Sequence, residues 1–226
     1  MGKNNDKNVY YTDPSMNDKL ETATQEKDVG VIFTNNLKFD EHINNAVKKA
    51  NQMVGLIRRS FEYIDKDMLL KLYKSIVRPQ LEYANVVWHP LFQRQKILLE
   101  KVQRRATKMV PGPSQLSYED RLISLSLPTI KYRQTRGDLI QSFKIINGYD
   151  NVDCNDFFTF TKTSTRNPEF KLYKEHTNTI TRRNFLPHRI NNIWNKLPIS
   201  VKCAENINKF KQLIDNHLTH LKYESY

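Results

Sequence analysis

The chain has 226 residues, a formal net charge of +12 and a pI of about 9.6, a balance that favours a nucleic acid or an acidic membrane surface as partner. No apolar run approaches the ~20 residues that cross a bilayer, and residues 1–13 lack the apolar core of a signal peptide, so we expect no membrane partner. Two cysteines, Cys154 and Cys203, exclude a multi-disulfide scaffold and favour an intracellular protein, nuclear or cytoplasmic, with reduced thiols; a single bridge between them stays open.

Residues 1–38 are predicted to form short strands. Residues 9–12 and 19–24 fit two strands joined by a turn at residues 13–18. Residues 29–33 are apolar and β-branched and predict a further strand. As a plain edge strand, it should leave its outer edge exposed.

Residues 39–110 are predicted to form a bundle of about four helices joined by short turns. In the first helix the apolar side chains fall within about 100° of arc, which is the pattern of an amphipathic helix. Asp40 is expected to cap that helix and Asp65 to open the next. Pro79 and Pro90 are expected to interrupt the helical pattern. The expected helices cover residues 40–60, a segment that begins at Asp65, residues 80–88 and residues 92–110.

Residues 115–226 are predicted to form a helical region that contains a small sheet. The sequence PGPS at residues 111–114 marks the boundary before it. The expected helices cover residues 118–125 with Ser117 as cap, residues 128–147, residues 187–197 and residues 204–221. Within residues 150–184, strands are expected at residues 157–163, 170–173 and 179–184. The predicted fold class is therefore mainly α, a helical bundle preceded by short β-strands and followed by an α+β C-terminal region.

The bundle also carries a family resemblance. Its motifs are, in order, Tyr73 in a helix, Pro79, Leu-Glu-Tyr-Ala at residues 81–84, Trp-His-Pro at residues 88–90 and Leu-Glu-Lys-Val-Gln at residues 99–103. In this order and spacing they resemble the region downstream of the polymerase palm in jockey-like non-LTR retrotransposon reverse transcriptases. Similar pieces elsewhere, such as Lys-Asp-Val-Gly-Val at residues 27–31 and Trp-Asn-Lys-Leu-Pro at residues 194–198, extend the resemblance over residues 10–218.

The resemblance implies a catalytically incomplete fragment of an RNA-directed DNA polymerase, with residues 1–38 as the end of the palm and residues 39–110 as the thumb. Polymerases of this kind hold two metal ions on clustered carboxylates, which include an adjacent Asp-Asp pair, and the chain contains no such pair. Asp65 and Asp67 stand at a predicted helix start and are interpreted as capping residues. We therefore expect no catalytic residue, no enzymatic activity, no metal site, no cofactor and no small-molecule substrate.

Cationic residues on the predicted helices are the candidate binding residues. They lie beside apolar stripes, and that arrangement suits a helix that packs inward and meets a polyanion outward. The candidates are Lys71, Lys74, Arg78, Arg94, Lys101, Arg105, Lys108, Arg182, Arg183 and Arg189. Some are interleaved with aromatic residues, as in surfaces that bind phosphates and stack bases. A solvated basic face with no special role is the alternative interpretation of the same pattern.

The predicted function is non-sequence-specific binding of RNA or DNA, as a template–primer, through the phosphate backbone. The alternative is a helical protein-interaction module, or a transposon remnant with no nucleic-acid role. Trp88 and Trp194 are expected to be core anchors rather than stacking platforms. The sequence carries no signal for an oligomeric state.

Overall fold

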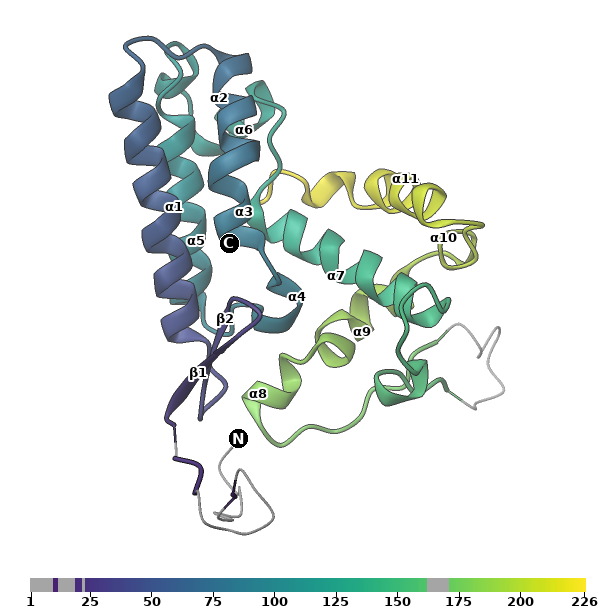
Figure 1. Ribbon diagram of the computed structural model, residues 1–226. Coiled ribbons are helices and arrows are strands. Elements are labelled where there is room, and N and C mark those ends of the chain that lie inside the picture. Colours follow the sequence, from purple (N-terminus) through teal and green to yellow (C-terminus); the bar gives the residue numbers. More distant parts are fainter. Residues whose placement is uncertain (1–9, 12–18, 22, 162–170) are drawn as a thin grey trace.

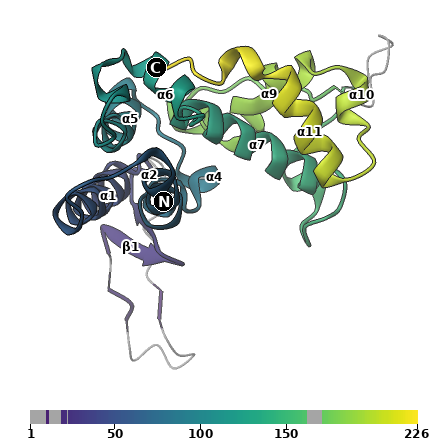
Figure 2. The same ribbon diagram turned by 90° about the horizontal axis from the view of Figure 1, so that it is seen from above.

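The computed structural model describes residues 10–11, 19–21, 23–161 and 171–226. It is about 60% helical, so the prediction of a mainly α fold is confirmed. The helices form two layers that stand side by side, a bundle of long helices and a C-terminal layer packed against one side of it (Figure 1, Figure 2). Within the described part of the chain, no helix is both long and apolar enough to span a membrane. Cys154 and Cys203 are free thiols, as expected.

A two-stranded antiparallel hairpin precedes the bundle. β1 (Gln25–Asp28) pairs with β2 (Val31–Thr34), so the strand predicted at residues 29–33 begins two residues later, and its partner β1 was not predicted. Val29 and Gly30 form the turn between them with φ values of 42° and 82°. These are left-handed conformations, which glycine adopts without strain.

The hairpin is fastened to the bundle through β2 and the turn. The backbone N–H of Ile32 donates to Nδ1 of His42 at 3.2 Å. The hydroxyl of Tyr83 donates to the carbonyl oxygen of Val29 at 2.9 Å. The prediction that this strand leaves its outer edge exposed is therefore wrong at Ile32, because a helix of the bundle covers it.

The strands predicted further upstream are reduced to one bridge in the described residues. Tyr11 pairs with Lys19 in an isolated antiparallel bridge, and the N–H of Leu20 donates to the carbonyl of Tyr10 at 2.9 Å. The turn predicted at residues 13–18 lies outside the described residues.

The bundle begins with the longest helix, whose predicted bounds are confirmed. Asp40 is its first residue, not its cap; Phe39 holds the N-cap position in a left-handed conformation with φ of 56°. The Asp40 carboxylate accepts hydrogen bonds from Arg94 and Gln95 instead. The helices of the bundle are α1 (Asp40–Ser60), α2 (Lys66–Leu72), the π-helix η1 (Tyr73–Val77), α3 (Arg78–Glu82), α4 (Asn85–Trp88) and α5 (Gln93–Thr107).

Pro79 does not interrupt the bundle as predicted. α2, η1 and α3 follow one another without a break, beginning at the predicted cap Asp65, whose carboxylate accepts from the N–H of Met68 at 2.8 Å. Proline lacks an N–H and its ring crowds the preceding turn, and the wider π-helical turn just before Pro79 accommodates both effects. The chain breaks instead after α3, where Ala84 adopts a left-handed φ of 52°.

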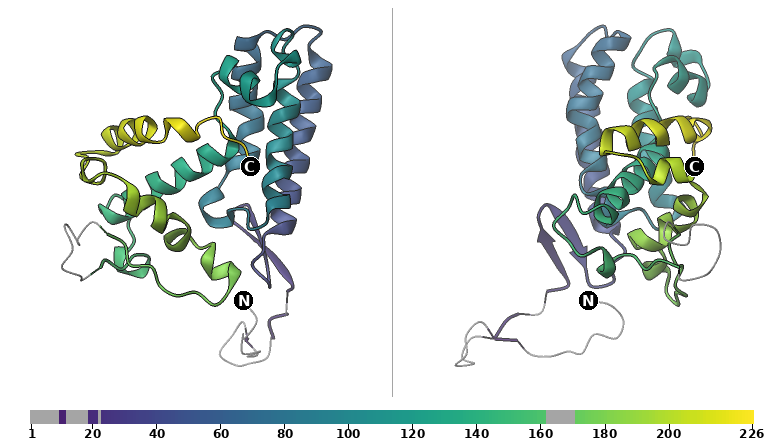
Figure 3. Two further views of the ribbon diagram at one scale, coloured as in Figure 1. Left: turned by 180° about the vertical axis from the view of Figure 1, so that it is seen from behind. Right: turned by 90° about the vertical axis from the view of Figure 1, so that its right-hand side faces the viewer.

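α1 and α5 run parallel. The hydrogen bond from Arg94 to Asp40 and the one from Arg105 to Asn51 each join residues 54 positions apart in the sequence. A constant offset at both bonds means that the two helices keep one register along their length. The view from behind shows the long helices of the bundle side by side (Figure 3).

The C-terminal layer contains the predicted helices, with α7 beginning at Ile130 after a Thr129 cap rather than at Pro128. Residues 179–184, predicted as a strand, form helix α8, and the predicted small sheet is reduced to one bridge between Phe160 and Leu172 among the described residues. Two segments before this layer, η2 (Pro113–Gln115) and α6 (Tyr118–Ser124), lie at the tip of the bundle, and α6 belongs to the bundle core. The helical segments of the C-terminal layer are α7 (Ile130–Ile146), η3 (Cys154–Asp156), α8 (Ile180–Arg183), α9 (Leu186–Lys196), α10 (Ile199–Lys202), α11 (Ile207–His217) and η5 (Thr219–Leu221).

Two hydrophobic cores correspond to the two layers. The bundle core surrounds the fully buried Trp88, and the C-terminal core surrounds Trp194, so both tryptophans are core anchors as predicted. In the C-terminal core the rings of Phe143 and Phe210 stack with centroids 4.1 Å apart. α7 starts in the bundle core at Ile130 and continues into the C-terminal core, so it joins the layers.

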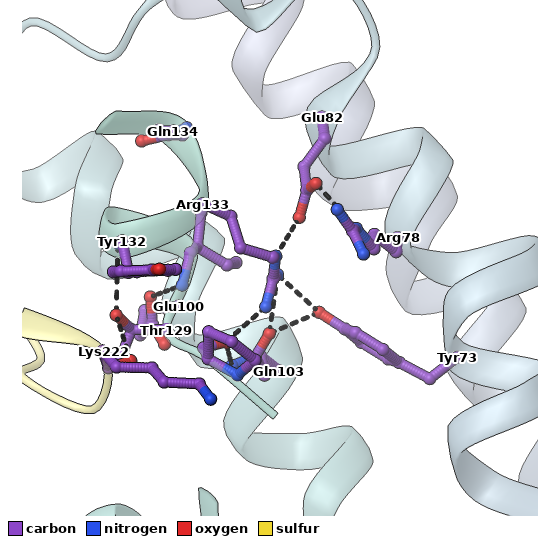
Figure 4. Close-up of polar contacts among 12 residues, drawn as sticks. Tyr73, Arg78, Glu82, Glu100, Gln103, Thr129, Tyr132, Arg133, Gln134 and Lys222 are labelled. Atoms are coloured by element: carbon purple, nitrogen blue, oxygen red, sulfur yellow. Dashed lines mark hydrogen bonds and ion pairs between the residues drawn. The ribbon is translucent and has the colours of Figure 1, made fainter. Parts of the chain in front are cut away.

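A buried polar network lies where α7 meets the bundle (Figure 4). The guanidinium of Arg133 on α7 donates to the carboxylate of Glu82 on α3 and to the side-chain oxygen of Gln103 on α5. Gln103 also accepts from the hydroxyl of Tyr73 at 2.6 Å. Burial raises the pKa of Tyr73 to about 12, so its hydroxyl stays a donor at neutral pH. The network gives the buried charge of Arg133 its partners and links α7 to α3 and α5 of the bundle.

Candidate nucleic-acid interface

One stripe of α5 gathers four of the predicted cations. Arg94, Lys101, Arg105 and Lys108 are all exposed, and their spacing places them within about 60° of arc on a helix with ~3.6 residues per turn. Two of them are held toward α1: Arg94 donates to Asp40 at 2.9 Å and Arg105 donates to Asn51 at 3.0 Å. No described residue forms a hydrogen bond or ion pair with the ammonium group of Lys101 or Lys108, so both are free to bind an anion.

The parallel packing brings two further cations to the same side. Lys48 and Arg58 of α1 are exposed and lie three residues before and seven residues after Asn51, which places them on the face of α1 that adjoins the stripe. Sequence reasoning did not select them, because an amphipathic pattern shows which side of a helix is buried but not which neighbour flanks it. We call the α5 stripe with Lys48 and Arg58 the α1–α5 face.

This face carries almost no negative charge. Between residues 42 and 60 the chain has no Asp or Glu. Across α5 the one acidic residue is Glu100, which is buried, accepts from the hydroxyl of Tyr118 and accepts from the N–H of Ile130 at 3.1 Å. Asp40, at the end of the face, is neutralised by Arg94. The exposed cations therefore meet solvent with no competing carboxylate beside them.

The predicted cations of α2–α3 lie elsewhere. Lys71 and Lys74 are exposed and no described residue pairs with their ammonium groups. Arg78 forms an ion pair at 2.8 Å with Glu82, the same carboxylate that Arg133 of α7 binds. This row therefore lies on the side of the bundle near α7, whereas the α5 stripe lies beside α1. The two predicted sets do not merge into one surface.

The three C-terminal arginines have different surroundings. Arg182 is exposed, lies 5.1 Å above the ring of Phe185 and forms a loose ion pair with Glu175. Arg183 is exposed and lies on the same short helix.

Arg189 is not available to a ligand, so the prediction that it binds phosphate is wrong. Its side chain is 10% exposed and forms a two-pronged ion pair with Asp138, with bonds at 2.8 and 2.6 Å. It also donates to the carbonyl oxygens of Val86 and Asn184. The arginine therefore ties α4, α7 and α9 together inside the protein.

No group of three or more His, Cys, Asp or Glu side chains in the described residues is arranged to hold a metal ion. His217 and His220 are both exposed. The α1–α5 face is therefore defined by its exposed cations and by the packing of its two helices.

Comparison with known proteins adds one relative. No protein-family profile matches the chain, and no solved structure matches it. An uncharacterized protein of Caenorhabditis elegans, B0403.1, is 28% identical over 128 residues, which make up 54% of this chain and 63% of that protein. The chain thus spans less than two thirds of the length of this relative. None of the three comparisons indicates a reverse transcriptase, so that resemblance remains a prediction.

Proposed function

We propose that this chain binds nucleic-acid duplexes through the phosphate backbone, using the α1–α5 face, and that it is a thumb-like fragment of a non-LTR retrotransposon reverse transcriptase. One observation carries the proposal: the α1–α5 face is cationic, and neither α1 after Glu41 nor α5 has an exposed carboxylate. Cations with no local partner gain most from a phosphate, because no existing ion pair has to be broken.

The geometry of the face favours backbone contacts over base reading. The stripe from Arg94 to Lys108, the C-cap of α5, spans 14 residue steps, or about 21 Å at ~1.5 Å per step, which equals about six base-pair steps at ~3.4 Å. A row of Lys and Arg side chains at this spacing suits contacts with phosphate oxygens, which position a protein on a duplex and carry no sequence information. Binding should therefore follow charge and duplex shape rather than sequence.

An interaction module is the second candidate, and one observation favours it. Apolar side chains remain exposed near the tip of the bundle, including Phe61, Tyr63, Leu116 and Ile123. The start of α2 and the end of α6 meet there through the bond from Lys66 to the carbonyl of Ser124. A protein partner covering this tip would leave the α1–α5 face without a role.

The salt dependence of duplex binding tests the first proposal. Each neutralised phosphate adds about 0.9 to the slope of log affinity against log salt on duplex DNA. Replacing Lys101, Arg105 and Lys108 together with Gln should lower that slope by up to ~2.7, because up to three phosphate contacts are lost. The variant should still fold, because all three side chains project away from the core. Fluorescence anisotropy over a series of salt concentrations measures the slope.

A matched triple variant controls for total charge. Lys196, Lys209 and Lys211, on α9 and α11, have no partner for their ammonium groups among the described residues. Their replacement with Gln removes the same formal charge and should change the slope little. Equal losses from the two triple variants would contradict a dedicated face and favour the interaction module.

A further inference from the structure

A cleft opens between the bundle and the C-terminal layer. Its volume is about 1270 Å³. Its walls are the segment at residues 36–39, helix α4 with His89, the second half of α7 with the residues that follow it, and the segment at residues 179–186 that contains α8 (Figure 1). The volume lies just above the roughly 300–1,000 Å³ of typical small-molecule pockets. The cleft is therefore large enough for a long-chain ligand.

The wall of the cleft is largely apolar. More than half of the residues that line it have apolar side chains. Three of them come from different elements and are about half exposed: Val87 on α4 at 52%, Val152 after α7 at 46% and Ile180 on α8 at 50%. Apolar side chains that gather in a concave surface are typical of a ligand-binding groove.

Several polar side chains of the lining already have partners within the protein. Lys144 is paired with Asp150 at 2.6 Å, and Arg182 is paired with Glu175 at 3.5 Å. The hydroxyl of Thr179 accepts from the backbone N–H of Arg182 at 3.2 Å. These groups support the walls and do not offer a free charge to an occupant.

Lys38 differs from the other cations of the lining. Its side chain is exposed, and no described residue forms a hydrogen bond or an ion pair with its ammonium group. An anionic group of a ligand can therefore bind there without first breaking an ion pair of the protein.

The imidazole of His89 is the second open polar group. Its Nδ1 is buried and faces Asp138, whose nearest carboxylate oxygen is 3.6 Å away. Its Nε2 also lacks a hydrogen-bond partner among the described residues, but it is not buried: the side chain is 14% exposed and the residue lines the cleft. Burial, with Arg189 and Lys96 nearby, holds the pKa of His89 well below its ordinary value, so the ring is neutral. The carboxylate beside Nδ1 favours the proton on that nitrogen, which leaves Nε2 as a hydrogen-bond acceptor open to the cleft.

We propose that this cleft binds a long-chain apolar acid that carries a hydroxyl group. The chain lies against the apolar wall, the carboxylate meets the ammonium group of Lys38, and the hydroxyl donates to Nε2 of His89. An extended peptide fits less well, because each of its buried backbone amides would need a partner that an apolar wall does not offer.

The inference does not depend on nucleic-acid binding, because it uses a different surface and a different class of ligand. From the sequence we predicted no small-molecule substrate. The segments that line the cleft are far apart in the chain and meet only in the fold.

Isothermal titration calorimetry below the micelle concentration of each probe tests the proposal. The probes are three series with the same range of chain lengths: ω-hydroxy fatty acids, unsubstituted fatty acids, and methyl esters of the ω-hydroxy acids. We expect the ω-hydroxy acids to bind most tightly. One chain length should bind best, because only one length reaches from Lys38 to His89.

Two variants separate the two polar contacts. Lys38→Gln should weaken the acids by about 2-fold to 5-fold, the range for an exposed ion pair, and should leave the methyl esters unchanged. His89→Phe keeps a ring of similar shape but removes the acceptor. It should weaken the ω-hydroxy acids by about 2-fold to 10-fold and leave the unsubstituted acids unchanged.

A third variant keeps the test decisive if His89→Phe fails to fold. Val87→Asp changes a half-exposed side chain and places a carboxylate in the wall, so all acids should bind at least about 10-fold more weakly. Ile123→Asp is the matched control, because Ile123 is equally exposed at 52% but lies at the tip of the bundle. It should bind every probe as the wild-type protein does.

Three results would overturn the proposal. The first is no saturable binding of any acid to the wild-type protein, which would leave the apolar cleft to a helix of a partner protein. The second is an equal loss in Val87→Asp and Ile123→Asp. The third is wild-type binding of every probe by both Lys38→Gln and His89→Phe. The Lys101, Arg105 and Lys108 triple variant should bind the acids normally, so failure of this proposal and failure of the proposed function are distinguishable.

Discussion

At the scale of single residues, Arg133 matters most for the contact between the two layers. Its side chain is 5% exposed and is bound by Glu82, Gln103 and the carbonyl of Pro128. Removing Arg133 leaves Glu82 with only the more exposed Arg78 as partner and takes the donor away from Gln103 and Pro128. Breaking a buried pair in this way costs up to about 3–5 kcal/mol. We expect Arg133→Met to lower the free energy of unfolding by about that amount in urea denaturation.

Arg78 supplies the matched control, because it binds the same Glu82 carboxylate from a side chain that is 40% exposed. Arg78→Met should cost no more than about 1 kcal/mol, the usual limit for an exposed pair. Similar losses from the two variants would show that the network does not hold the layers together.

Three histidines are held neutral in the folded protein. Burial lowers the pKa of His42, His89 and His188, helped by Lys49, Arg189 and Arg182 respectively. The unfolded chain therefore takes up protons first as the pH falls below about 6.5, and it gains stability relative to the folded state. We expect the urea midpoint to fall between about pH 7.5 and pH 5.5.

The contribution of His89 to this pH dependence can be measured separately from that of the other two histidines. It faces Asp138, Arg189 and Lys96, and burial raises the pKa of Asp138, which opposes the histidine effect at lower pH. His89→Gln should reduce the loss of midpoint on acidification, whereas His217→Gln, at an exposed position, should not. An unchanged loss in His89→Gln would mean that His89 is not neutral when folded.

The feature hardest to predict from sequence was which Lys and Arg side chains stay free and which form ion pairs inside the protein. Lys101 and Arg189 both stand beside apolar stripes, yet the first meets solvent and the second meets Asp138. Helical spacing reports which side chains lie beside the buried stripe, but a long cation beside it extends either to water or to a carboxylate on another element. That choice depends on packing between α7 and α9, which are far apart in sequence from α4.

At the scale of elements, helix positions were predictable and their mutual directions were not. The apolar arc of α1 and the caps Asp65, Ser117 and Thr129 are local signals, and all but the last were recognised. α1 and α5 are parallel because the segment between them in the sequence, α2 to α3, runs back along the bundle in the opposite direction. The π-helical turn before Pro79 compensates for the proline, which a local rule reads only as a break.

Two glycines test how local backbone shape supports the elements. Gly30 has φ of 82° and a Cβ added there would lie 3.2 Å from Cε1 of Tyr83, so Gly30→Ala should destabilise the protein by about 1–2 kcal/mol. Gly137 lies inside α7, where a Cβ would come no closer than 4.0 Å to Oδ1 of Asn85. Gly137→Ala should stabilise by about 0.5–1 kcal/mol.

Thermal or urea denaturation of both variants gives the comparison. Opposite signs are expected, because one substitution forces a left-handed alanine and the other removes a flexible residue from a helix. Two losses of equal size would mean that α7 is packed too tightly at Gly137 for a methyl group.

At the scale of the whole molecule, the charge is unevenly used. Arg133, Arg136 and Arg189 are paired with carboxylates and therefore add nothing to the excess of +12. The α1–α5 face is different, because Lys101 and Lys108 have no partner among the described residues. A charge total alone predicts weak adhesion anywhere on the surface, whereas our proposal assigns the binding to the α1–α5 face.

Lysine footprinting tests this central claim most directly. The protein is acetylated with and without a saturating DNA duplex at low salt, and the modification of each lysine is read by mass spectrometry. We predict that Lys48, Lys101 and Lys108 become protected together, while Lys196, Lys209 and Lys211 react as in the free protein. Uniform protection of all lysines, or protection confined to Lys71 and Lys74, would contradict the account.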